Sequence, residues 1–282
     1  MGMLGFLGAG KMATALARGF VASGKVAAGD LVASDPVPAA REALAQAAPG
    51  RTLTYGQSTR VTALDPAQGA FATYPGGYEV GYCMFDRLVD FDADLRIVPG
   101  LATRWEMAAD VKSVRFTLRQ GVKFHNGDAF TADDVVYTLN LVSSDDSKIS
   151  TPSNANWIER AEKTGEYSVR VKLKKATPAA MEYFAMVLPI YPKAYREKVG
   201  PDGFAKAPVA AGPYKFTKVD AGQVDFAKFD GYWAGSPRGA ASIGKIQVRF
   251  VPDAATEVTE LLAGRADFVW NFPSDQFDGI GK

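Results

Sequence analysis

The residue types that most often perform chemistry are scarce in this chain. It contains one histidine, His125, and one cysteine, Cys83. A lone cysteine cannot form a disulfide within the chain, and a zinc site usually needs several Cys and His ligands. A Ser-His-Asp site would depend on His125, and the sequence has no Gly-x-Ser-x-Gly turn. We therefore predict no catalytic residue and no metal site, with Cys83 as a buried small apolar side chain and His125 as a turn residue.

One glycine-rich stretch has the spacing of a phosphate-binding turn. Gly8, Gly10 and Ala13 fit the pattern G-x-G-x-x-A, between a short apolar run and an Ala/Leu-rich segment. The first glycine permits a tight turn, the second lets the backbone approach a pyrophosphate, and the alanine allows close helix packing. Asp35 follows a second apolar run, about where a ribose-binding acid belongs. The order predicts a strand, a glycine turn, a helix and a second strand, which together form a Rossmann-like βαβ fragment.

The amino-acid sequence of this stretch resembles the start of pyrroline-5-carboxylate reductase. The resemblance implies a set of residues that would contact NADPH: Gly8, Gly10, Lys11, Met12 and Asp35. It ends near Ala48, and the reductase's remaining strands and helical dimerisation domain have no counterpart downstream. Because a dinucleotide needs both halves of a doubly wound sheet, we expect residues 1–48 to bind no cofactor. NADPH binding by resemblance is the alternative.

The composition limits the classes of partner. Hydrophobic residues make up 47% of the chain and the formal net charge is +1, so the chain is globular and carries no charge excess that would favour nucleic acid. No apolar run approaches the roughly 18 residues that a membrane span needs. We predict a protein without a nucleic-acid partner and without a membrane span.

The sequence changes in character at Pro49–Gly50, which we take as a domain boundary. Beyond it, aromatic and β-branched runs replace the Ala-rich segment, and a strand is expected from Thr52 onward. Residues 114–118 and 167–173 alternate between apolar and polar side chains, as half-buried strands do. This part of the chain therefore predicts sheets that pack on one face.

Turn and cap signals separate these strands. Asn126–Gly127 suits a hairpin turn, and Asp65 before Pro66 is typical of a turn former. Thr131 can cap a helix whose first turn holds acidic residues, Asp133 and Asp134. We expect a helix to begin directly after Thr131.

Nine sequence motifs after residue 50, in order and with consistent spacing, resemble those of solute-binding protein family 5. This family comprises the substrate-binding proteins of peptide and nickel ABC transporters. The most characteristic motif is residues 116–128, FTLRQGVKFHNGD, which is followed by residues 131–139. The other motifs are residues 64–66, 85–89, 98–105, 212–215, 231–233, 251–255 and 261–267.

This resemblance implies an α/β fold. Residues 50–282 would form a mixed periplasmic-binding-protein-like lobe of the type II class with an antiparallel-rich subdomain, after a βαβ fragment at residues 1–49. Family members are longer, so it implies a truncated chain that lacks the second lobe. It also places six residues near the ligand cleft: Tyr82, Cys83, Met84, Phe85, Trp270 and Asn271. For Phe85 and Trp270, packing in the core is an equal alternative.

The same resemblance implies a binding protein and not an enzyme. Such a protein captures a small peptide or similar solute and delivers it to an ABC permease, in the periplasm or outside the cell. Arg18 interrupts the apolar residues 13–23, so they make a poor signal peptide, and the chain as it stands would stay in the cytoplasm. One alternative is an NAD(P)H-dependent pyrroline-5-carboxylate reductase. Another is a chimeric chain, because a cytosolic nucleotide-binding start and an exported lobe belong to different compartments.

Overall fold

The computed structural model describes residues 4–7, 31–34, 52–58, 60, 64–68, 75–92, 94–145, 149–220, 222–241 and 243–269. The chain divides into two compact units. The central unit comprises Thr62–Phe216 and Phe229–Ala240. The terminal unit comprises Met1–Val61, Thr217–Lys228 and Ala241–Lys282.

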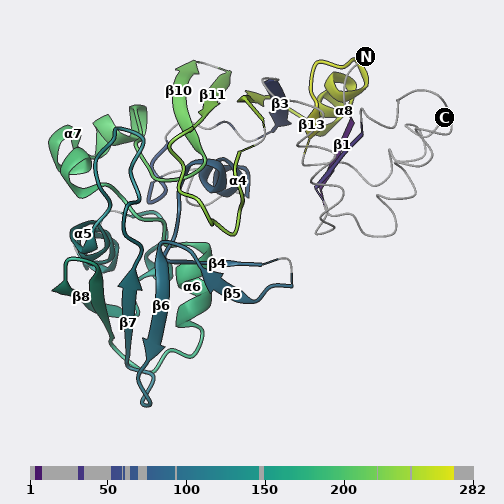
Figure 1. Ribbon diagram of the computed structural model, residues 1–282. Helices are drawn as coiled ribbons and strands as arrows, with labels where there is room; N and C mark the ends of the chain where they lie inside the picture. The colour runs from purple at the N-terminus through teal and green to yellow at the C-terminus, as the bar shows by residue number, and fades with distance from the viewer. Residues whose placement is uncertain are drawn as a thin grey trace. The chain divides into compact units, whose positions relative to one another are not determined.

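An antiparallel sheet in the order β6-β7-β9-β8 forms one part of the central unit (Figure 1). Its strands are β6 (Ala102–Met107), β7 (Ser113–Leu118), β8 (Ile158–Gly165) and β9 (Ser168–Leu173). In β7, Val114, Phe116 and Leu118 are buried while Arg115 and Thr117 are exposed. The alternation and the antiparallel-rich subdomain that the sequence predicts are confirmed.

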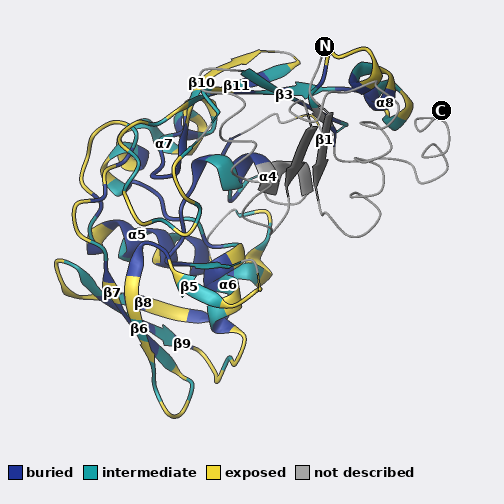
Figure 2. Cartoon of the chain, turned by 45° about the vertical axis from the view of Figure 1, so that its right-hand side comes forward, coloured by how far each residue is buried: buried dark blue, intermediate teal, exposed yellow. Residues whose placement is uncertain are grey.

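Helix α5 (Ala132–Ser143) packs against β8 and β9 (Figure 2). Thr131 caps the helix as predicted, because its Oγ1 accepts from the Asp133 N–H at 3.3 Å. In return, the Thr131 N–H donates to Asp134 Oδ2 at 2.8 Å, which completes a capping box. Asp134 Oδ1 also accepts from the Lys193 N–H at 2.9 Å, so this cap joins the starts of two helices.

The remaining elements of the central unit surround an aromatic core. They are α4 (Pro75–Met84), β4 (Val89–Phe91), β5 (Ile97–Pro99), η2 (Pro152–Asn154), α6 (Ala180–Met186) and α7 (Lys193–Lys206). The Phe204 ring lies 6.2 Å from that of Phe85 and 5.2 Å from that of Tyr191, measured between centroids. All three side chains are at most 1% exposed, and burying each contributes about 1.5–3 kcal/mol.

The two predicted turns of this unit are present. Gly127 has a φ of 91° and its N–H donates to Phe124 O at 2.9 Å, which closes the hairpin turn. Asp65 Oδ1 accepts from the Ala67 N–H at 3.0 Å, so Asp65 is a turn former as predicted.

The terminal unit contains a five-stranded sheet in the order β10-β11-β12-β3-β13. Its elements are β3 (Thr52–Gln57), β10 (Tyr214–Asp220), β11 (Gln223–Lys228), β12 (Lys245–Phe250), α8 (Ala254–Leu262) and β13 (Phe268–Val269). Strand β3 pairs in parallel with both β12 and β13. The strand expected from Thr52 onward is therefore confirmed, and it lies inside a mixed sheet.

Two further strands, β1 (Leu4–Leu7) and β2 (Leu31–Ser34), pair in parallel in a sheet of their own. A parallel pair needs a crossover connection between its strands, as the βαβ prediction requires. The connecting residues 8–30 and the boundary at Pro49–Gly50 lie outside the described residues. The division into residues 1–49 and 50–282 stays a prediction.

Candidate functional site

Of the six residues that the resemblance places near a ligand, the structure describes four. They lie together at the C-terminal end of α4: Tyr82, Cys83, Met84 and Phe85. Trp270 and Asn271 lie outside the described residues, and so do Gly8, Gly10, Lys11, Met12 and Asp35 of the predicted nucleotide-binding turn.

These four side chains differ in burial. Met84 and Phe85 are 0% and 1% exposed, so both pack in the core, whereas Tyr82 and Cys83 are half-buried. Val80 and Met84 are both buried and lie one helical turn apart, on one face of the C-terminal part of α4. Cys83 lies beside that face, so the prediction that it is buried is wrong. Whether the four residues contact a ligand stays a prediction.

The backbone that follows α4 is held by three distant segments. Met84 O accepts from the Gly212 N–H at 2.9 Å, Asp86 O from Ile190 at 3.1 Å, and Arg87 O from Leu101 at 2.9 Å. A Cβ added to Gly212 would lie 2.4 Å from Met84 O, so only glycine allows this approach. The segment from residue 84 to residue 87 is therefore positioned by contacts and not by its own loop conformation.

Arg238 caps the same helix end. Its Nη1 donates to Tyr82 O at 2.5 Å and to Phe85 O at 3.0 Å, and its Nε donates to Asp90 Oδ2 at 2.8 Å. The last carbonyls of a helix lack intrahelical partners and attract cations. Arg238 satisfies two carbonyls at this end and brings a positive charge to the negative end of α4.

Asp86 is the acidic centre of this cluster. Its carboxylate accepts from Trp233 Nε1 at 2.7 Å and from the Tyr232 hydroxyl at 3.2 Å, and Arg238 Nη1 lies 3.4 Å away. Burial raises the pKa of Asp86, and the Arg238 charge and the two hydrogen bonds oppose that rise. Asp86 is not among the predicted site residues, although the segments at residues 85–89 and 231–233 contain all of these groups except Arg238.

Arg87 is a second buried cation at this site. It is 4% exposed, its Nε donates to Met186 O at 2.9 Å, and its guanidinium lies 3.6 Å from the centroid of the Tyr82 ring. Burial and the nearby Arg238 charge lower the pKa of Arg87 to about 10. Nη1 of Arg87 has no hydrogen-bond partner within the described part of the chain, so this donor is left unsatisfied.

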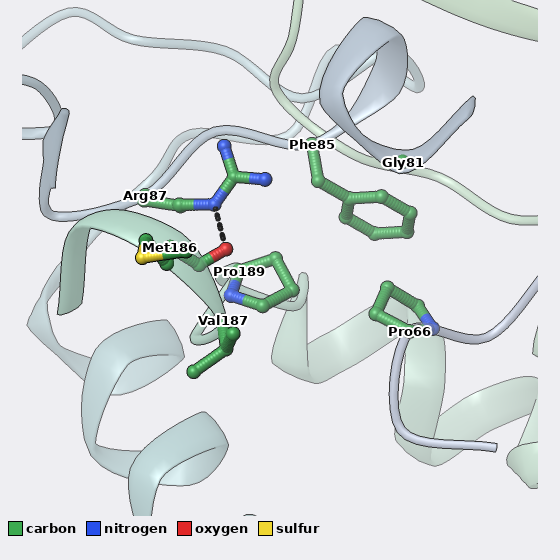
Figure 3. Close-up of a pocket in the computed structure, with 7 residues that line it drawn as sticks. All are labelled: Pro66, Gly81, Phe85, Arg87, Met186, Val187 and Pro189. Carbon is green, nitrogen blue, oxygen red and sulfur yellow. Dashed lines mark hydrogen bonds between the residues drawn. The ribbon is translucent and has the colours of Figure 1, made fainter. Parts of the chain in front are cut away.

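A pocket of about 280 Å³, counted with its open mouth, lies beside Arg87 (Figure 3). Its lining is apolar apart from Arg87 and comprises Pro66, Gly81, Phe85, Arg87, Met186, Val187 and Pro189. An apolar pocket with one placed polar group is the usual form of a small-molecule site. Phe85, one of the residues predicted to lie near a ligand, is among these lining residues.

His125 is a residue of the hairpin turn, as predicted, and joins the turn to a distant loop. Its Nε2 lies 3.0 Å from Gly212 O, and its Nδ1 accepts from the Ala210 N–H at 3.3 Å. A neutral ring protonated at Nε2 satisfies both contacts. Burial lowers the pKa of His125 to about 4, the hydrogen bond to Gly212 opposes this, and Lys215 adds to it. His125 therefore supports the Gly212 backbone that contacts Met84.

Metal-binding clusters and membrane-spanning helices are absent from the described residues. No group of three or more His, Cys, Asp or Glu side chains there is placed to hold a metal ion. No helix in that part of the chain has the length and apolar character to cross a bilayer.

The profile of the bacterial extracellular solute-binding proteins, family 5 (middle), matches residues 96–281. The chain belongs to this family. The match includes the antiparallel sheet, helix α5 and the residues that surround Asp86 from the C-terminal side, namely Tyr232, Trp233 and Arg238. Proteins of family 5 act in the periplasm or outside the cell.

Individual relatives agree with this assignment. The glutathione-binding protein GsiB of Pectobacterium atrosepticum is 31% identical over 72% of this chain and 39% of its own length. The di/tripeptide-binding protein 1 of Pseudomonas aeruginosa is 26% identical over 77% of this chain and 44% of its own length. The solved structure of AgaA with agropinic acid, from A. tumefaciens R10, is 30% identical, with a TM-score of 0.72 over 80% of this chain and 45% of AgaA. The family 5 chain thus spans less than half the length of these relatives.

A second profile, of the NADP oxidoreductases that depend on coenzyme F420, matches residues 3–70. This match confirms the resemblance of the N-terminal segment to a nicotinamide-dependent reductase. The hypothesis that the chain joins two unrelated fragments stays a prediction.

Proposed function

We propose that this family 5 chain serves as part of an ABC-transporter binding protein that captures a small peptide or similar solute for import. The observation that carries the proposal is the 31% identity to a glutathione-binding protein over 72% of the chain. The proposed partner is an ABC permease, and the proposed location is the periplasm or the cell exterior.

The geometry at the end of α4 supports a binding role over a catalytic one. Asp86, the buried acid there, has its carboxylate engaged by Trp233, Tyr232 and Arg238, so it is not available as a general base. His125, a common general base in enzymes, has both ring nitrogens engaged by backbone groups. What remains accessible is an apolar pocket with one guanidinium, which suits recognition of a solute.

Isothermal titration of the chain tests this function. The ligands are glutathione, alanyl-leucine, a tripeptide and a nickel–histidine complex, each added to protein whose folding is verified by circular dichroism. We expect saturable heat with at least one of the three peptides. Folded protein that gives no heat with any ligand would contradict the proposal, and heat with the nickel complex alone would replace the peptide assignment.

A second candidate function concerns residues 1–48 only. The match to NADP-dependent oxidoreductases and the parallel pairing of β1 with β2 both favour a nucleotide-binding fragment there. Titration with NADPH, followed by its fluorescence, tests it. On this alternative, NADPH binds the wild type and not Gly10→Val, because a side chain at Gly10 would block the approach of a pyrophosphate. No binding, or equal binding by Gly10→Val, removes this function.

A further inference from the structure

The pocket beside Arg87 combines apolar walls with a buried cation that has no carboxylate partner. Ion pairs in the described residues join Arg238 to Asp86 and Asp90, at 3.4 and 2.8 Å, and none joins either carboxylate to Arg87. The remaining contacts of Asp86 go to Trp233 and Tyr232. Asp90 and Asp86 attract the charge of Arg87 without forming an ion pair with it. The described residues therefore leave this buried cation without a direct carboxylate partner, which is costly.

We propose that Arg87 is a specificity-determining residue that binds a carboxylate group of the solute, while the pocket beside it holds a short branched apolar group. This inference rests on the proposed solute-binding function, because that function is what makes the carboxylate part of a transported solute. The pocket and its binding chemistry can be tested without that claim.

The hydrogen-bonding capacity of Arg87 fits this partner. Its Nε is occupied by Met186 O at 2.9 Å, whereas its Nη1 is buried without a partner in the described chain. Carboxylate oxygens are strong acceptors for guanidinium donors, and charge-assisted bonds of this kind are about twice as strong as neutral ones. A carboxylate oxygen would satisfy the donor and neutralise the charge together.

The guanidinium is also held in place before any solute arrives. The Tyr82 ring lies 3.6 Å beneath it, and the backbone of Arg87 forms an antiparallel bridge with that of Pro189, a residue of the pocket wall. The cation and the wall therefore keep their relative positions. A preorganised site loses less conformational entropy on binding than a mobile one.

The electrostatics support the same partner. Burial and the Arg238 charge lower the pKa of Arg87 to about 10 although Tyr82, Asp90 and Asp86 oppose this, so on balance its surroundings disfavour the charged form. An anion bound nearby acts in the opposite direction. A neutral solute would leave this penalty in place.

The walls and the mouth of the pocket define the rest of the solute group. Phe85, Val187 and Pro189 line the pocket, and Met186, which is 48% exposed, is a flexible side chain on it (Figure 3). The volume of about 280 Å³ includes open solvent at the mouth, and the enclosed part is much smaller, so only a small apolar group fits there. The solute class is therefore a carboxylate attached to a short branched apolar group.

A titration of the whole chain with isobutyrate and with its neutral isostere, isobutyramide, tests this inference. The readout is the Nε–H signal of Arg87 in ¹⁵N-labelled protein, assigned by its loss in Arg87→Met. We expect isobutyrate to shift this signal in a saturable way, and isobutyramide to bind at least about tenfold more weakly because it lacks the charge. Arg87→Met should lose isobutyrate binding by at least about tenfold, measured by isothermal titration, and Arg87→Lys should retain part of it.

Arg104→Met is the matched control, because Arg104 is an exposed arginine in the same unit. It should bind isobutyrate as the wild type does. Circular dichroism verifies that each variant is folded. Equal binding of isobutyrate and isobutyramide, no shift of the Arg87 signal, or full binding by folded Arg87→Met would each overturn the inference.

Titrations with peptides separate this inference from the proposed function. If alanyl-leucine or glutathione binds the wild type and Arg87→Met equally, the chain is a solute-binding protein but Arg87 does not select the solute. If isobutyrate binds through Arg87 and no peptide binds, the carboxylate site stands and the peptide-binding function fails.

Discussion

Two buried arginines of the central unit, Arg196 and Arg87, have similar surroundings and different electrostatic partners. They are 6% and 4% exposed, and each guanidinium lies over a tyrosine ring, that of Tyr191 at 4.7 Å and that of Tyr82 at 3.6 Å. Arg196 forms an ion pair with the fully buried Asp65 at 2.7 Å, whereas no carboxylate in the described chain pairs with Arg87. Burial alone therefore does not indicate what a charged residue does.

The difference suggests how to tell a structural cation from a binding one. The charge of Arg196 is compensated inside the fold, and the Tyr191 hydroxyl donates to the same Asp65 at 2.5 Å. The charge of Arg87 has no ion-pair partner among the described residues and lies beside a pocket. Arg196 should then matter for stability and Arg87 for binding.

The largest expected effect separates the two arginines directly. Arg196→Met leaves the carboxylate of Asp65 buried without its cation, which should cost about 3–5 kcal/mol in the free energy of unfolding. Arg87→Met leaves no carboxylate unpaired and should change it by about 1 kcal/mol or less. Urea unfolding followed by tryptophan fluorescence measures both. Equal losses would end the distinction drawn between these residues.

The two tyrosines whose rings contact these arginines, Tyr191 and Tyr82, can be compared in the same way. Tyr191→Phe removes a hydrogen bond to a buried carboxylate and should cost about 1.5–3 kcal/mol. Tyr82→Phe removes only an exposed contact to Met186 O at 3.4 Å and should cost less than about 0.5 kcal/mol. Thermal unfolding of the two variants side by side checks the ranking. A larger loss in Tyr82→Phe would show that Arg87 also depends on this hydroxyl.

A backbone change tests whether the segment that carries Arg87 is rigid. In Gly212→Ala the new Cβ would lie 2.4 Å from Met84 O, so the backbone must shift at a cost of about 1–3 kcal/mol. Gly222→Ala is the control, because no atom lies within 4 Å of the added Cβ there. We expect the control to unfold within about 0.5 kcal/mol of the wild type. Unfolding in urea that is unchanged in Gly212→Ala would mean that this end of α4 tolerates movement.

The smallest effect is the pH dependence that His125 contributes through Gly212. Its folded-state pKa of about 4 lies below the ordinary value of 6.5, so the neutral ring stabilises the fold. This contribution is fully present above pH 6.5 and is lost as the pH falls toward 4. Since the ring is partly exposed, we expect the free energy of unfolding to fall by at most about 2 kcal/mol between pH 7 and 4.5. The loss should be absent in His125→Gln, which cannot gain a proton. An NMR titration of His125 that gives a pKa near 6.5 would contradict this.

Much of the fold could be predicted because its signals lie close together in the chain. The capping box needs Thr131 and Asp134 three residues apart, and the hairpin turn needs Asn126 next to Gly127. Phe85, which the resemblance places near a ligand, lines the pocket beside Arg87, and its contact with a ligand stays a prediction. The prediction for Cys83 was wrong because the buried face of α4 is set by what packs against the helix, and residue type alone does not report it.

The sequence by itself determined the family, the strands at Thr52, at residues 114–118 and at residues 167–173, the helix after Thr131, and the role of Asp65 as a turn former. Only the tertiary structure decided that Asp65 also pairs with Arg196, 131 residues away, and that Arg238 takes the carboxylates that Arg87 lacks. A cap or a turn needs neighbours in the chain, so spacing predicts it. The partner of a buried charge depends on which distant segments pack together, and an arginine in the sequence looks the same whether it is paired inside the fold or left beside a pocket.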